Sequence, residues 1–136
     1  MGSIQDDDFS TFTVTYNGTA AENDWFAVPL NGAVTISNVV FGHGQNFHDG
    51  GWFDTSAGKP IVQVQSTRDG VWETVGELSD YPKTTVANNG GLKPGQKFTC
   101  ELKKPVKGVA VRVIGVPSSG DNPTQAFSSC SELQAK

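Results

Sequence analysis

The sequence predicts an all-β domain, an antiparallel β-sandwich or jelly roll. Several short segments alternate apolar and polar residues with a period of two, which is typical of half-buried strands. Sixteen glycines and seven prolines help to separate these segments at intervals of about eight to twelve residues. No segment has the period of a helix. At 136 residues the chain is expected to form one domain, 1–136, that buries about two thirds of the surface its unfolded chain would expose.

The first half of the chain is expected to contain four strands. Met1-Gly2-Ser3 resembles the remnant of an expression tag, and Asp6-Asp7-Asp8 is typical of a solvated start, so residues 1–8 are expected to lie outside the fold. The expected strands cover residues 11–16, 24–30, 33–41 and 60–66. Asn17-Gly18-Thr19 ends the first of them and is also an acceptor sequence for N-glycosylation.

The second half begins with a predicted hairpin. Asp69-Gly70 supplies the positive φ angles of a tight turn, so residues 71–78 should return beside 60–66. Residues 82–95 contain two prolines and the run Asn88-Asn89-Gly90-Gly91, which indicates an irregular stretch. Further strands are expected at 98–102, 108–116 and 126–135, with a polar loop over 117–125.

Composition argues against two classes of partner. The net charge is −4, the isoelectric point is near 5.0, and the ten basic residues form no stripe that could follow a nucleic-acid backbone. No apolar run reaches the roughly eighteen residues of a membrane-spanning helix. The expected partners therefore exclude nucleic acid and membrane insertion, and the chain is expected to be a monomer.

The loop 41–54, FGHGQNFHDGGWFD, has an unusual composition. Its four glycines disfavour a helix or a long strand because each adds backbone freedom without a side chain to pack. Between them lie polar and aromatic side chains in unusual number for a loop: His43, Asn46, Phe47, His48, Asp49, Trp52 and Phe53. This concentration predicts a surface that holds a ligand.

The two cysteines, Cys100 and Cys130, are too widely separated for a zinc knuckle. Both fall in expected strands, and a disulfide between them would close a loop of about thirty residues, worth about 3 kcal/mol in the chain-entropy model. We predict this bridge, and with it a secreted protein, since disulfides persist outside the reducing cytosol. Two reduced, buried thiols are the alternative.

The chain resembles a known family in several segments: VQVQSTRDGVWETVGEL (62–78), VAVRVIGV (109–116) and a last strand that contains Ser131-Glu132-Leu133. These are similar to the discoidin or coagulation-factor type C family, in particular its carbohydrate-binding modules, over residues 24–134. The resemblance implies a galactose-binding-like jelly roll. It also suggests a structural calcium site, for which Glu132 matches the acidic residue of the closing strand. The family's early calcium segment has no match here. No other cofactor is expected.

In this family the ligand lies on loops at one end of the sandwich, which here correspond to residues 41–59 and 117–127. A sugar has an apolar face and a rim of hydroxyls, so its site needs a flat ring beside donors and acceptors. Trp52 or Phe127 is predicted to supply the ring; Trp52 and Phe53 are adjacent, so only one of them should face solvent. The predicted polar contacts are His43, Asn46, His48, Asp49, Asn122 and Arg68.

The sequence therefore predicts a non-catalytic carbohydrate-binding module of a secreted, glycan-active protein, with an oligo- or polysaccharide ligand. A discoidin-like adhesion or protein-binding domain is the alternative. A small metal-dependent enzyme using His43, His48 and Asp49 is less favoured because their spacing matches no rigid metal motif. Arg112, Trp25 and Trp72 fall in strands and are expected to be structural.

Overall fold

The computed structural model describes residues 13–14, 23–122 and 125–136, all of them in strands, turns or loops. Its strands are β1 Thr13–Val14, β2 Asp24–His43, β3 Phe53–Asp54, β4 Ile61–Gln65, β5 Trp72–Glu77, β6 Lys97–Pro117 and β7 Ser129–Ala135. The predicted all-β antiparallel fold is confirmed. Residues 1–8, the acceptor sequence at Asn17 and most of the predicted strand 11–16 lie outside the described residues. Within the described part there is no helix long and apolar enough to cross a membrane.

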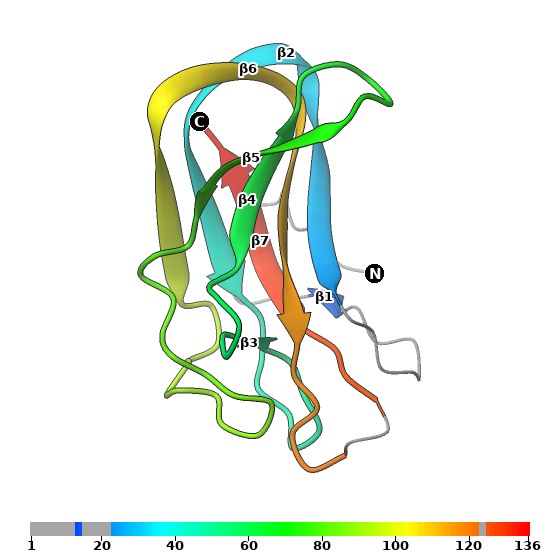
Figure 1. Ribbon diagram of the computed structural model, residues 1–136, viewed down its shortest axis with the longest axis vertical. Helices are drawn as coiled ribbons and strands as arrows, with labels where there is room; N and C mark the ends of the chain where they lie inside the picture. The colour runs from blue at the N-terminus through cyan, green and yellow to red at the C-terminus, as the bar shows by residue number, and fades with distance from the viewer. Residues whose placement is uncertain (1–12, 15–22, 123–124) are drawn as a thin grey trace.

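The two long strands, β2 and β6, run through both layers of the sandwich (Figure 1). They pair with each other along most of their length and arch over together at the end opposite the loops. One layer contains β1, β7, the second half of β2 and the first half of β6; the other contains the first half of β2, the second half of β6, β4 and β5. The sequence predicted four separate strands here. Turn residues such as Gly32, with φ 80°, bend β2 without interrupting it because β6 bends alongside.

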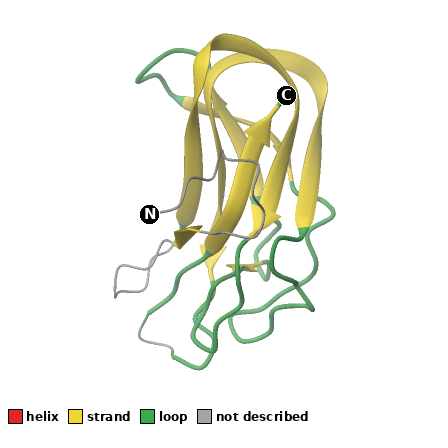
Figure 2. Cartoon of the chain, turned by 180° about the vertical axis from the view of Figure 1, so that it is seen from behind, coloured by secondary structure: helices red, strands yellow, loops and turns green. Residues whose placement is uncertain are grey.

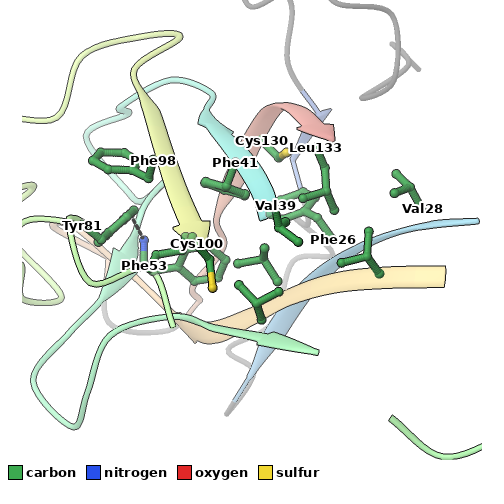
Figure 3. Close-up of a cluster of buried hydrophobic side chains, with 14 of the residues drawn as sticks. Phe26, Val28, Val39, Phe41, Phe53, Tyr81, Phe98, Cys100, Cys130 and Leu133 are labelled. Carbon is green, nitrogen blue, oxygen red and sulfur yellow. Dashed lines mark hydrogen bonds between the residues drawn. The ribbon is translucent and has the colours of Figure 1, made fainter. Parts of the chain in front are cut away.

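The hydrophobic core lies between these two layers, as Figure 3 shows. Strand positions alternate as predicted, so that Phe26, Val28, Val62 and Val64 are buried between exposed or half-buried neighbours. At the loop end the core is closed by Tyr81, whose hydroxyl accepts a hydrogen bond of 2.9 Å from the backbone N–H of Phe53. Burial raises the pKa of this hydroxyl, so it stays protonated.

The loops that join β2 to β3, β5 to β6 and β6 to β7 gather at one end of the sandwich (Figure 2). The β4–β5 hairpin turns at the other end. The predicted pairing of these two strands is confirmed, but their connection spans residues 66–71 and is not a tight two-residue turn; of the Asp-Gly pair only Asp69 has a positive φ, 61°. The fold thus brings residues far apart in sequence together at the loop end.

Candidate functional site

The centre of the loop end is a tight turn over residues 47–50. The N–H of Phe47 donates to the carbonyl of Gly50 at 2.8 Å, and Gly50 takes a φ of 143° that a side chain would disfavour. A Cβ at Gly50 would lie 2.8 Å from the carbonyl oxygen of Ser118. The glycine therefore lets the loop that follows β6 pack directly against this turn.

Backbone hydrogen bonds join the two loops. The N–H of Asp121 donates to the carbonyl of His48 at 2.8 Å, and that of Gly51 donates to the carbonyl of Phe127 at 3.0 Å. A third loop is added where the N–H of Gly120 donates to the carbonyl of Val86 at 2.6 Å. Three loops therefore form one connected surface, whose shape the backbone holds.

An aromatic side chain lies on this surface, but it is neither of the two predicted. Phe47 is 36% exposed, and its ring packs on the ring of Phe127, with centroids 5.7 Å apart. Phe127 itself is buried, so it supports the exposed ring instead of presenting one, and its predicted role as the platform is wrong. The position of Phe47 at the start of the turn Phe-His-Asp-Gly is the sequence signal that could have found it.

An exposed ion pair joins the residue after Phe47, His48, to the loop that follows β6. Nδ1 of His48 donates to both carboxylate oxygens of Asp121 at 3.1 Å. The hydrogen bond and the charge of Asp121, and the charge of Asp49, raise the pKa of His48 because they stabilise the imidazolium. Nε2 of His48 has no partner among the described residues. The pair therefore offers a donor and a carboxylate acceptor on the same loop surface that exposes Phe47. Asp121 was missing from the predicted set.

Trp52 was predicted as the other ring, and the structure contradicts this. Trp52 is 3% exposed, and its indole N–H donates to the carbonyl of Thr85 at 2.8 Å. Phe53 is buried as well. The expectation that one of two adjacent aromatics faces solvent fails because the loop that contains Thr85 packs on Trp52, just before β3, while Phe53 enters the core.

His43 and Asn46 form an internal pair and not a ligand contact. His43 is fully buried, and its Nε2 lies 2.8 Å from Oδ1 of Asn46, while Nδ2 of Asn46 donates to the carbonyl of Leu92 at 2.7 Å. The amide oxygen is therefore the acceptor and Nε2 carries the proton. Burial lowers the pKa of His43 from 6.5 to about 4, so the ring is neutral. The predicted sugar contact by His43 is wrong, and Asn46 holds the loop from within.

The remaining predicted residues divide by position. His48 and Asp49 in the turn, and Asn122 in the loop after β6, belong to the surface at the loop end. Arg68 does not. It is exposed in the β4–β5 hairpin, and Gln65 before it pairs with Ala110, about 20 Å along β6 from the end of that strand at Pro117. Proximity in sequence suggested Arg68, but the direction of β4 carries it to the opposite end.

The predicted disulfide is wrong. Both cysteines are free and buried, and they appear at separate places in the core in Figure 3. Cys100 on β6 pairs with Val39 of β2, and Cys130 on β7 pairs with His43 on the other side of the same strand. The separation is therefore two strand spacings, about 10 Å, and about 13 Å along the strand. A disulfide needs Cα atoms within about 7 Å. Burial raises the pKa of both thiols.

The calcium prediction for Glu132 stays a prediction. Glu132 is buried on β7, and its Oε2 accepts a hydrogen bond of 3.2 Å from Nε2 of Gln134. In the part of the chain that the structure describes, no three His, Cys, Asp or Glu side chains gather as a metal site. The described acidic side chains therefore do not by themselves supply the oxygen ligands that calcium requires.

A groove of about 1050 Å³ lies elsewhere, on the side of the sandwich between β5 and the first half of β6. Val75, Cys100 and Val106 contribute apolar side chains to it, and Glu77 and Asp80 acidic ones. None of the predicted site residues lines this groove. A sugar site at the loop end would be a surface site formed by the three loops.

No family model matches the sequence, and no curated protein is similar to it. Solved structures are similar. CpGH89CBM32-5 from Clostridium perfringens, in complex with GalNAc-β-1,3-galactose, has a TM-score of 0.64 at 16% identity, covering 96% of this chain and 78% of the other. The family 32 module of C. perfringens NanJ, in complex with galactose, has a TM-score of 0.62 at 16% identity, covering 96% and 79%. The chain has the fold of these modules.

A third neighbour is the family 32 module of AlyQ, in complex with 4,5-unsaturated mannuronic acid. Its TM-score is 0.58 at 14% identity, and the similarity covers 98% of this chain and 82% of that one. The galactose-binding-like jelly roll that the sequence predicted is therefore confirmed. At such identities the likeness concerns the fold, and the side chains of the loops have to be interpreted on their own chemistry.

Proposed function

We propose that this protein is a non-catalytic carbohydrate-binding module of a secreted, glycan-active protein and that it binds sugar at the loop end. One observation carries the proposal: the turn 47–50 and the loop hydrogen-bonded to it present an exposed aromatic ring, Phe47, and the exposed His48–Asp121 pair. The ring can pack against the C–H face of a pyranose. The imidazole and the carboxylate can donate to and accept from its hydroxyls.

The fold supports the same proposal. Its structural neighbours are carbohydrate-binding modules, two of them in complex with galactose-containing ligands. The site consists of backbone-joined loops, so little ordering is required when a ligand binds. A shallow site with few contacts should give a dissociation constant in the range of about 10 μM to 1 mM.

The test is a titration of the whole chain with galactose and with GalNAc-β-1,3-galactose, followed by calorimetry or NMR. Phe47→Ala should weaken binding by about fivefold or more, since a lost central contact costs about 1 to 3 kcal/mol. His48→Ala should do the same because it leaves a sugar hydroxyl unpaired. Val71→Ala is the matched control, because Val71 is also an exposed apolar residue but lies next to the hairpin at the other end.

Unchanged affinity in a folded Phe47→Ala variant would remove the ring from the site. Equal weakening in Val71→Ala would show that the effect is not local to the loop end. Hydrolysis of a glycan by the purified chain would contradict the non-catalytic part of the proposal.

A further inference from the structure

The outer face of the layer that contains β4 and β5 carries a cluster of side chains that the loop-end site does not use. Inward positions of this layer, such as Val28, Val111 and Val64, are buried, so the alternate residues face outward. Three of these outward residues make contact: Trp25 on β2, Arg112 on β6 and Trp72 on β5. The guanidinium carbon of Arg112 lies 4.5 Å from the ring centroid of Trp72 and 5.7 Å from that of Trp25.

The arginine in this cluster is fixed in position. Its Nε donates to Oε1 of Gln63 on β4 at 2.7 Å, and the two indole rings contact the guanidinium. This arrangement leaves the two terminal Nη groups available to a ligand. Their N–H bonds match the two oxygens of a carboxylate. Among the described residues, no carboxylate forms an ion pair with Arg112. The cation is therefore pre-organised and not neutralised.

Trp25 is too exposed for a purely structural role. The ring is 52% exposed, the largest aromatic surface that the described residues leave open to water. The rings of Trp25 and Trp72 both lie close to the guanidinium carbon of Arg112, which puts their centroids at most about 10 Å apart, so two rings and one cation form a single continuous patch. A patch with open aromatic area and one oriented cation is complementary to a chain that has apolar faces and carries carboxylates.

We propose that the face formed by Trp25, Arg112 and Trp72 binds a polysaccharide that contains uronate residues, as a second surface distinct from the loop end. This inference rests on the proposed function only in taking glycans as the class of partner. The negative net charge of −4 opposes nonspecific adhesion to a polyanion, so retention by such a polymer has to come from a local contact.

The experiment is affinity electrophoresis of the full chain in native gels that contain sodium polygalacturonate, its carboxyl-reduced counterpart, or no polymer. We expect polygalacturonate to retard the protein, and the reduced polymer to retard it much less because Arg112 then meets hydroxyls alone. Trp25→Ala and Arg112→Gln should each weaken retardation about fivefold or more. Arg112→Lys, which keeps the charge but loses the fork, should recover only part of it. Added salt should weaken the wild-type interaction.

Phe47→Ala is the control that separates the two surfaces. It should lose affinity for galactose and keep wild-type retardation in polygalacturonate. If polygalacturonate does not retard the wild-type protein, or if both face variants move like the wild type, the second surface is overturned while galactose binding still tests the loop end.

Three other results would also overturn the proposal. Equal retardation by the carboxyl-reduced polymer would remove the role assigned to Arg112. Loss of retardation in Phe47→Ala alone would assign the polymer to the loop end. A dimer in sedimentation velocity that Trp25→Ala dissociates, with retardation unchanged, would make the face an interface between copies. Thermal unfolding of each variant shows whether it is folded. If Arg112→Gln does not fold, Trp25→Ala tests the proposal.

Discussion

Buried His43 should make the domain unstable in acid. Its ring is fully buried, its Nε2 donates to Asn46, and its Nδ1 has no hydrogen-bond partner. Protonation would place a charge and an unsatisfied N–H donor in the interior, both of which are costly there. Desolvation accordingly lowers the pKa of His43 from 6.5 to about 4.

The sign of the effect follows from these two values. The unfolded chain takes up the proton near pH 6.5 and the folded chain only near pH 4, so the unfolded state binds more protons between them. The stabilising contribution of neutral His43 is fully present above the unfolded pKa and is lost as the pH falls toward the folded pKa. A pKa difference of this size corresponds to about 2 kcal/mol lost between pH 7 and pH 5, and to about 3 kcal/mol by pH 4.

Urea unfolding followed by tryptophan fluorescence at a series of pH values between 7 and 4 measures this loss. The informative comparison is with His43→Gln, whose amide can still donate to Asn46 but does not titrate. The variant has its own cost at every pH, so the difference in pH dependence, and not in stability at one pH, isolates the imidazole. We expect the free energy of unfolding to fall by about 2 kcal/mol less in the variant between pH 7 and pH 5.

His48→Gln is the control with the opposite sign. The pKa of exposed His48 is raised by Asp121, so its contribution is present at low pH and lost as the pH rises through the folded value. Removing it should not reduce acid sensitivity. Parallel pH profiles for the wild type and His43→Gln would refute the reasoning, since they would mean that His43 is not the buried titrating group.

Trp52 and the two cysteines are buried in the core, and not in the ligand contact or the disulfide that the sequence predicted. Trp52→Ala should lower the free energy of unfolding by about 3 to 5 kcal/mol, because it removes a buried ring and the hydrogen bond to Thr85; a change in melting temperature as small as that of Phe47→Ala would place Trp52 on the surface instead. Cys100 and Cys130 should both be alkylated when the protein is unfolded without reductant, and neither should react quickly when it is folded; an unreduced mass that lacks both adducts would restore the disulfide.

The sequence alone was sufficient for the class of fold and for several local features. Alternation with a period of two identifies strands because successive side chains point to opposite faces, whatever lies on those faces. Asp69-Gly70 identified a hairpin for a similarly local reason, since few residues adopt positive φ without strain. The glycine-rich loop 41–54 was identified as part of the candidate site by its composition, and His48 and Asp49 do lie on the surface at the loop end.

Tertiary structure decided which side chains that surface presents and which residues meet. The sequence contains three aromatic residues in one loop, but only packing determines that Phe47 is exposed while Trp52 and Phe53 are covered. Asp121 joins His48 across 73 positions of sequence because backbone hydrogen bonds align two loops. The cysteines are kept apart because β2 lies between their strands. Each of these outcomes depends on strand order and on loops that pack against one another, and neither leaves a periodic signal in the chain.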